Sequence, residues 1–261
     1  MTNYSPLLSV ATTAFIASAL LGEPMPVRHV QGYIHGFVVL KDLDDKILAS
    51  GDVTQLPVGS RMTTMTSLRF KDGSLYEETA VFSQRRTYQL LRYKLVQKGP
   101  AFKTSQTLTF DTSTDKVNVQ YVDKDGNAKT LSEHLTLPPD LANGFIPILM
   151  TDADPTVETI LSMLVVTPKP RVVKLKISST EEDPFSIGGS VAKATHYVIK
   201  IDIGGLTGVA AKVVGKQPPP VHVWVAAGKA PVFLKSEGAL YEDGPIWRIE
   251  LASPSWPTPK Q

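Results

Sequence analysis

The chain has 261 residues, of which 42% are apolar, so it can bury a sizeable core and wholesale disorder is excluded. Its 27 Lys and Arg against 25 Asp and Glu give a net charge of +2, which lacks the strong basic excess of a dedicated nucleic-acid binder. The absence of cysteine excludes disulfides, thiolate metal sites and cysteine nucleophiles.

The first residues have the pattern of an export signal. Pro6–Leu21 carries no charge, is rich in Ala, Leu and Thr, and is shorter than the roughly 20 apolar residues of a transmembrane helix. Ala17-Ser18-Ala19 offers a small-x-small cleavage site, although no Lys or Arg precedes the run. We predict a signal peptide over residues 1–24 and one domain over residues 25–261, located in the periplasm or secreted. The alternatives are an uncleaved anchor and a helix of the domain itself.

From His29 to Leu137 the sequence predicts a series of antiparallel strands. Segments such as Arg61–Phe70 and Leu75–Gln84 have strand patterns, and turn residues separate them. Asp72-Gly73 predicts a tight hairpin because glycine readily takes the positive φ that such a turn needs, whereas Leu56–Gly59 predicts a break. Further strands are predicted at residues 32–40, 46–54, 87–96, 105–111, 116–122 and 129–137.

A segment in the middle of the chain interrupts this rhythm. Pro139 and Asp140 suit the start of a helix, and Gly144 and Pro147 predict that the helix is short or kinked. We interpret Pro139–Met150 as a lid or plug against the sheet. Its apolar positions recur at helical spacing, at Leu141, Phe145, Ile148 and Leu149.

Strands resume after this insert. Within Thr195–Ile203, Tyr197 and Ile199 share one face while His196 and Lys200 take the other, which is typical of a half-buried strand. Strands are predicted at residues 159–167, 171–178, 192–203, 221–226, 232–237 and 246–252. The predicted fold class is all-β with a minor helix: a long-stranded antiparallel sheet forming a half-barrel, with a short helical insert.

The motifs do not point to catalysis or to a bound metal. Asp123–Asn127 has calcium-loop residue types, but its glycine stands fourth rather than sixth, so a hairpin turn is the better interpretation. No two histidines have metal-ligand spacing, although His196 and His222 could meet on adjacent strands. Ser186–Ser190 is not the Gly-x-Ser-x-Gly elbow of serine hydrolases. We therefore predict no enzyme activity, no cofactor and no metal; a hydrolase using His196 or His222 beside a carboxylate is the least favoured alternative.

Two groups of side chains are candidates for ligand binding. Arg85 and Arg86, between two strands, could bind an anionic headgroup because a guanidinium matches phosphate, although charges in a turn more usually only discourage edge pairing. Aromatic residues of the strands could line an open concave face, since ligand pockets are mostly apolar. The candidate ligand-binding set is Phe70, Phe82, Tyr93, Phe110, Tyr197, Trp224 and Trp247.

The arrangement resembles the outer-membrane lipoprotein carrier (LolA-like) superfamily, which has an export signal, long antiparallel strands in an incomplete barrel, and helices over the concave face. The matching features are the leader, the hairpin series from His29, the insert and the strands that reach Ala252. Segments such as Glu78–Gln84 and Gly244–Pro254 are similar to those of uncharacterised exported bacterial proteins. The resemblance implies a concave apolar surface able to hold a lipid or acyl chain.

We therefore expect an exported, non-enzymatic protein that binds a hydrophobic or lipid-like ligand on the concave face of a β half-barrel. Its expected partners are a lipid or apolar ligand, or an envelope protein, and not nucleic acid. The alternative is a structural or interaction module of the cell envelope with a filled core. Whether the concave face is open or filled distinguishes the two hypotheses.

Overall fold

The computed structural model describes residues 22–166, 169–187, 190–203, 217–228 and 230–252. The predicted signal peptide lies outside the described residues except for its last three positions. Within the described ranges the chain forms fourteen strands and one short helix, and the strands make a single antiparallel sheet. The all-β fold class predicted from the sequence is confirmed. No helix among these residues is long and apolar enough to cross a membrane.

The strands follow one another through the sheet as two meanders. The first comprises β1 (Ile34–Lys41), β2 (Ile47–Val58), β3 (Arg61–Phe70), β4 (Leu75–Gln84), β5 (Tyr88–Lys98), β6 (Gln106–Asp111), β7 (Lys116–Val122) and β8 (Ala128–His134). After the helix α1 (Ile146–Asp152), the second comprises β9 (Thr159–Val166), β10 (Pro170–Ile187), β11 (Ser190–Asp202), β12 (Val221–Ala226), β13 (Val232–Ala239) and β14 (Ile246–Leu251).

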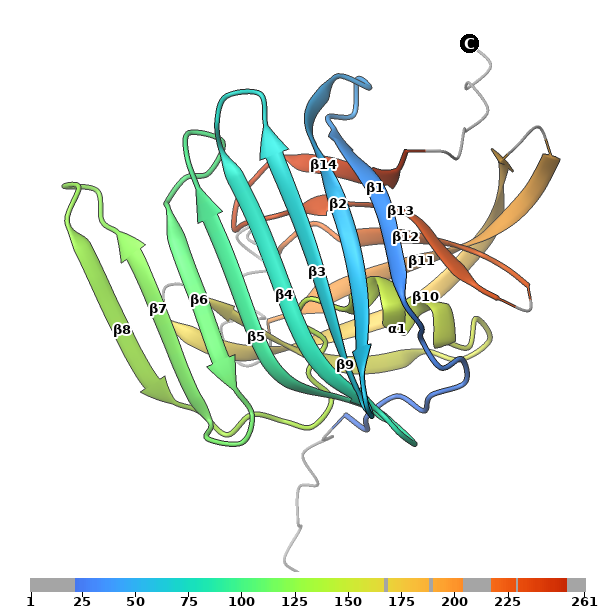
Figure 1. Ribbon diagram of the computed structural model, residues 1–261, viewed down its shortest axis with the longest axis horizontal. Helices are drawn as coiled ribbons and strands as arrows, with labels where there is room; N and C mark the ends of the chain where they lie inside the picture. Colours follow the sequence, from blue (N-terminus) through green and yellow to red (C-terminus); the bar gives the residue numbers. More distant parts are fainter. Residues whose placement is uncertain (1–21, 167–168, 188–189, 204–216, 229, 253–261) are drawn as a thin grey trace, which may run out of the picture.

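The two meanders join where β14 pairs with β1, from Val38↔Leu251 to Lys41↔Arg248. The sheet stays open between β8 and β9, which are its edges although they follow each other in the sequence. Figure 1 shows β1–β8 as a broad layer in front and β9–β14 crossing behind it. The segment that links β8 to β9 therefore joins the two open edges of one continuous sheet.

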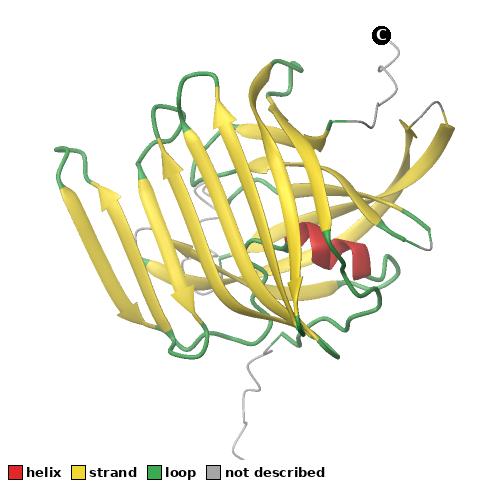
Figure 2. Cartoon of the chain, in the orientation of Figure 1, coloured by secondary structure: helices red, strands yellow, loops and turns green. Residues whose placement is uncertain are grey.

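This linking segment fills the concave side of the sheet. Leu141, Phe145 and Leu149 belong to one buried cluster with residues from both meanders. Phe145 is 1% exposed and stacks on Phe82, with ring centroids 4.7 Å apart and planes inclined by 12°. Figure 2 shows the helix between the two layers of strands. The insert thus takes the covering position expected of it, as a plug within a packed core.

The same segment also protects the edge strand β9. Leu141 forms a parallel bridge with Ser162, and the Ala142 N–H donates to the Ser162 carbonyl at 2.8 Å. The Asn143 side chain continues this ladder, since its Nδ2 donates to the Leu164 carbonyl and its Oδ1 accepts the Leu164 N–H, both at 2.9 Å. Because an unpaired edge is a template for aggregation, the segment shields the sheet at one of its open sides.

Two predicted boundaries near prolines are wrong. β2 continues through Pro57 to Val58, where the sequence predicts a break. Beyond Gln55 this strand has a partner on one side only, so proline is tolerated there as on an edge strand. The helix begins at Ile146 instead of Pro139, because the residues before it pair with β9.

A third correction concerns the length of β10. The sequence predicts a strand that ends at Ser178, whereas β10 continues to Ile187 in a hairpin with β11. The polar residues that follow Ser178 break the apolar alternation, and a register shift lies between Ser179 and Glu182. Figure 1 shows this end of the hairpin extending beyond the two layers.

At Gly144 the backbone of the insert lies close against the sheet. Its φ is +77°, and a Cβ there would lie 2.8 Å from Cε2 of Tyr93. Gly126, in the β7–β8 turn, has a similar φ of +82° with nothing within 4 Å of its Cβ position. We expect Gly144→Ala to lower the free energy of unfolding by about 3 kcal/mol and Gly126→Ala by about 1 kcal/mol, the difference being steric crowding. Urea unfolding measures both; equal losses would contradict the close approach.

Candidate functional site

Six of the seven aromatic residues predicted to line a ligand site lie in the filled interior. Four of them belong to the cluster that contains the insert: Phe82, Tyr93, Phe110 and Tyr197. Phe82 stacks on Phe145, and the ring centroids of Tyr93 and Phe110 are 5.0 Å apart. The Tyr197 hydroxyl donates to the Ala153 carbonyl at 3.0 Å. Their neighbours are therefore residues of the chain itself.

The other three aromatic residues lie apart from these four. Phe70 and Trp247, with ring centroids 5.5 Å apart, belong to a second buried cluster. Trp224 is in a small third cluster on the opposite face of β12, since Val223 and Val225 on either side of it face the interior. The structure does not bring the seven residues together in one site, and their ligand-binding role stays a prediction.

Glu78 is an ionisable residue that faces the interior from β4. Its Oε1 accepts a hydrogen bond of 2.6 Å from the Tyr93 hydroxyl. Burial raises the pKa of the Glu78 carboxyl, although hydrogen bonds from Tyr93 and Tyr76 act in the opposite direction. Burial also raises the pKa of Tyr93, to which the charge of Glu78 adds. These groups form a polar link between neighbouring strands β4 and β5.

Asp152 anchors the segment that precedes β1 to the end of α1. Its buried carboxylate accepts the backbone N–H groups of Arg28, at 2.8 Å, and of His29, at 3.0 Å. Nδ1 of His29 lies 2.7 Å from the same carboxylate, and the Tyr88 hydroxyl donates to it at 2.8 Å. Burial raises the pKa of Tyr88, and the hydrogen bond to Asp152 raises it further. Because two of the donors are backbone amides, this arrangement serves to hold the chain.

His196 and His222 meet on the outer face of β11 and β12, which confirms the contact considered from the sequence. Nε2 of His196 lies 2.8 Å from Nδ1 of His222, and the His196 ring stacks on Trp224 with centroids 4.2 Å apart. Asp183 lies 3.8 Å from Nδ1 of His196. Burial lowers the pKa of His196, and the neighbouring His222 lowers it further. Among the described residues, no group of three or more His, Asp or Glu side chains could hold a metal ion.

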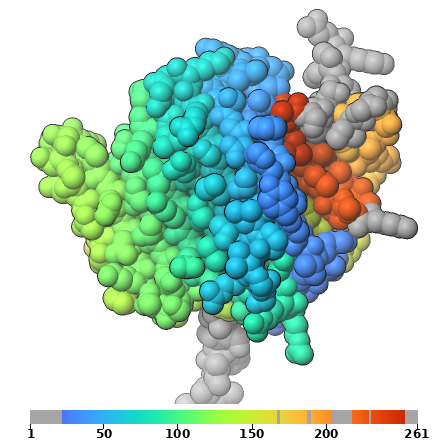
Figure 3. All heavy atoms as spheres, viewed as in Figure 1, coloured from blue at the N-terminus to red at the C-terminus, as the bar shows by residue number. Residues whose placement is uncertain are grey.

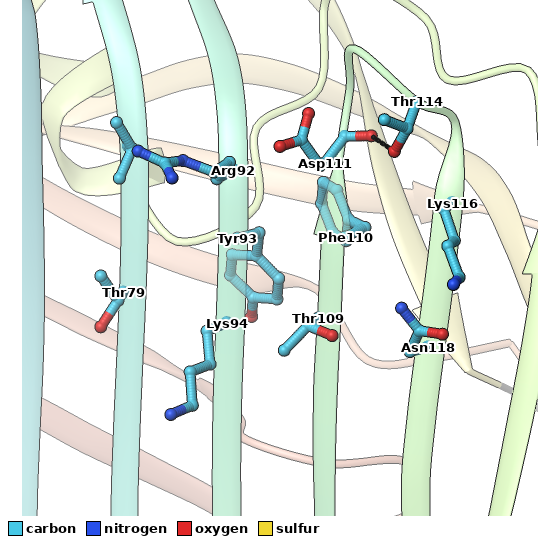
Figure 4. Close-up of a pocket in the computed structure, with 11 residues that line it drawn as sticks. Thr79, Arg92, Tyr93, Lys94, Thr109, Phe110, Asp111, Thr114, Lys116 and Asn118 are labelled. Carbon is cyan, nitrogen blue, oxygen red and sulfur yellow. Dashed lines mark hydrogen bonds between the residues drawn. The ribbon is translucent and has the colours of Figure 1, made fainter.

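An open groove of about 350 Å³ lies on the outer face of β4–β7 (Figure 4). The register places its side chains on one face, because directly opposite residues of paired strands point the same way. Tyr93 and Phe110 also border the groove, but their rings belong to the interior cluster. The rest of the lining consists of Thr79, Val81, Arg92, Lys94, Thr109, Asp111, Lys116 and Asn118 on the outer face, with Thr114 in the β6–β7 turn.

Cations dominate this outer groove. Arg92, Lys94 and Lys116 are exposed. Among the described residues, these three side chains form no ion pair within 4.0 Å. The carboxylate in the lining, Asp111, accepts the hydroxyl and the N–H of Ser113 at 2.6 and 2.9 Å. These two hydrogen bonds lower the pKa of Asp111. Asp111 lies directly opposite Arg92 and Lys116 in the register, so the groove carries three cations against this one carboxylate.

Neutral side chains add hydrogen-bond donors to the groove. Oδ1 of Asn118 accepts the Ser132 hydroxyl at 2.7 Å, which directs the amide nitrogen away from β8. Figure 4 shows this nitrogen on the side of Thr109. Guanidinium, ammonium and amide donors together suit a phosphate or carboxylate group. The lining formed by the described residues includes neither histidine nor serine, so the groove can bind an anion but offers no hydroxyl–imidazole pair for catalysis.

The sequence does not reveal this groove. Arg92, Lys94 and Lys116 each occupy an ordinary solvent-facing strand position when read singly. The signal lies in their alignment across β5–β7, and that alignment depends on register. A register shift between Val81 and Phe82 in the β4–β5 pair decides which residues of β5 share the outer face with Thr79. Alternation alone does not locate such a shift.

The fold and its groove define an open antiparallel β protein with an internal plug. The chain is similar in fold to a solved structure, the β-barrel-like protein of a domain of unknown function, DUF1849, from Brucella abortus. The two are 9% identical with a TM-score of 0.44, over 90% of this chain and 100% of that chain. No family model matches this chain, and no curated protein matches its sequence. The resemblance to lipoprotein carriers stays a prediction.

The anchor at Asp152 leads to a stability prediction. Removing the carboxylate leaves backbone and hydroxyl donors without their buried acceptor, so Asp152→Ala should lower the free energy of unfolding by about 3–5 kcal/mol. Asp154→Ala is the matched control, because its side chain is 35% exposed and pairs with Arg28 on the surface. Urea unfolding should show a much smaller loss for the control. Similar losses in the two variants would argue against the anchor.

The histidine pair leads to a prediction about pH. Burial lowers the pKa of folded His196 below the usual histidine value of 6.5, so the unfolded chain binds this proton more tightly. Stability should therefore fall as the pH drops below about 6.5. In His196→Gln, the difference in unfolding free energy between neutral and mildly acidic buffer should shrink. His134→Gln, at an exposed position of β8, should leave the difference unchanged; the same shrinkage there would refute the assignment.

Proposed function

We propose that this protein is a non-enzymatic interaction module of the cell envelope, a β half-barrel filled by its own chain that recognises a partner on the outside of its sheet. The observation that carries the proposal is the plug. Phe145 and its neighbours occupy the concave side and pack against Phe82, where a lipid-like ligand would have to lie. The envelope location rests on the predicted export signal.

The positions of the grooves support recognition on the outside. One groove lies on the outer face of β4–β7, and a second, of about 420 Å³, lies between residues 22–28 and the start of β9. The first presents cations and amide donors, which suit binding. In the second, the carboxylate of Asp152 is held by donors from the chain itself. These features favour binding over catalysis.

A ligand on the concave face would require the insert to leave the interior. That movement would break the ladder between Asn143 and Leu164 and the hydrogen bonds to Asp152. It would also expose the apolar cluster shared by both meanders to water. These costs support the filled module over the lipid carrier.

The purified protein should therefore carry no stoichiometric lipid and should not bind an apolar fluorescent dye saturably. Native mass spectrometry and a dye titration measure this. Phe145→Ala is the matched comparison, since it opens an apolar cavity beside Phe82 that should take up benzene or xenon where the wild type does not. One co-purifying lipid per chain, displaced by the dye, would contradict the filled interior and favour the lipid carrier.

A further inference from the structure

Large apolar side chains stand exposed beside the outer groove. Phe37 of β1 is 67% exposed, Leu56 and Val58 of β2 are 45% and 71% exposed, and Met65 of β3 is 41% exposed. We call these four residues the apolar strip. Exposed apolar side chains gathered in one place mark an interaction site more often than scattered ones do.

The apolar strip and the groove share one face of the sheet. The register sets Met65 opposite Thr79, whose neighbour on β5 is Lys94. It sets Leu56 opposite Thr63, and Thr63 opposite the groove residue Val81. The apolar surface therefore continues into the cationic groove without passing over an edge. Figure 3 shows the layer that carries β1–β8 as one broad surface.

Positive charge extends over this face beyond the groove. On β2–β7, three carboxylates occupy outer-face positions, Asp52, Glu77 and Asp111; Asp52 lies 3.6 Å from Nε2 of His35, and Asp111 accepts hydrogen bonds from Ser113. Six exposed cations occupy outer-face positions on the same strands. None of the six forms an ion pair within the described ranges. They are Arg61, Arg69, Arg92, Lys94, Lys98 and Lys116.

The arginine turn singled out in the sequence lies at the end of the same surface. Arg85, in the β4–β5 turn, donates from Nη2 to the Ser60 hydroxyl at 3.2 Å, which places it beside the start of β3. Arg86 follows it and is exposed. The turn therefore adds cations next to Arg61 and Val58, at the end of the apolar strip.

This combination indicates the chemistry of the partner. A soluble anion would use the cations alone and would leave the apolar strip in water. A surface of anionic phospholipid satisfies both, because its phosphate groups attract Lys and Arg while the boundary with the acyl chains accepts apolar side chains. We propose that the outer face of β1–β7 docks on anionic phospholipid bilayers, with the groove cations on phosphate groups and the apolar strip in the interfacial layer. This inference rests on the proposed function and names the partner.

Vesicle flotation tests the docking. The whole protein should float with vesicles of phosphatidylcholine and phosphatidylglycerol in equal parts, and not with phosphatidylcholine alone. The triple variant Arg92→Gln, Lys94→Gln, Lys116→Gln should bind the mixed vesicles about tenfold more weakly or worse. Its matched control is Lys103→Gln, Lys129→Gln, Lys193→Gln, which removes the same charge from exposed lysines in ion pairs elsewhere and should bind like the wild type.

The apolar strip has its own test. Phe37→Ser with Met65→Ser should weaken vesicle binding even in high salt, where the remaining attraction is mainly apolar. Val191→Ser with Val232→Ser, at exposed positions of β11 and β13, is the control and should have no effect. Thermal unfolding of each variant verifies that it is folded.

Several results would overturn docking. They are flotation with phosphatidylcholine alone, an equal loss in either control variant, and no flotation at all. If the wild type binds inorganic pyrophosphate with one-to-one stoichiometry and the triple variant does not, while neither floats with the mixed vesicles, the groove is a site for a soluble anion and docking is refuted. Failure of flotation leaves the dye and mass-spectrometry result on the filled interior standing. Flotation together with saturable dye binding would instead refute the proposed function alone.

Discussion

The structure depends on how an open sheet covers its own apolar concave side. In the part of the chain that the structure describes, fourteen antiparallel strands curve so that apolar residues of both meanders face inward, and the sheet stays open because β8 and β9 do not pair. The segment between these two edges both covers the inward-facing apolar residues and pairs with one of the open edges. It packs Phe145 against Phe82 in the interior, and it lies along β9 through Leu141 and Asn143. One stretch of chain thus supplies core packing and edge protection together.

Because the chain itself fills the interior, the outside of the sheet is the surface left open to a partner. Buried groups with suggestive chemistry, such as Asp152 with His29 and Tyr88, hold neighbouring segments in place. The groove on β4–β7 and the apolar strip beside it are different, because their cations and apolar side chains face solvent. Core packing and the proposed recognition therefore use opposite faces of the same strands, with Tyr93 packed inside and Lys94 exposed outside.

The sequence predicts the strands well because their signal is local. Arg61–Phe70 and Leu75–Gln84 are predicted to the residue, and Asp72-Gly73 marks the turn between them. What fills the sheet is not local. Alternation shows that Phe82 and Tyr197 share a buried face, but it does not show whether ligand or chain lies against them. The outer groove depends on a register shift that alternation does not reveal, so the sequence does not single out its three cations.

Native-state hydrogen exchange of the insert distinguishes a plug from a lid. If the insert is a plug, the amide of Ala142, bonded to Ser162, and the amide of Leu149, bonded to Phe145, exchange only by global unfolding, with the same free energy as amides in the middle of β5. Exchange of these two amides through a local opening of lower free energy, while β5 stays protected, would contradict the filled interior. The insert would then uncover the concave face in the folded protein.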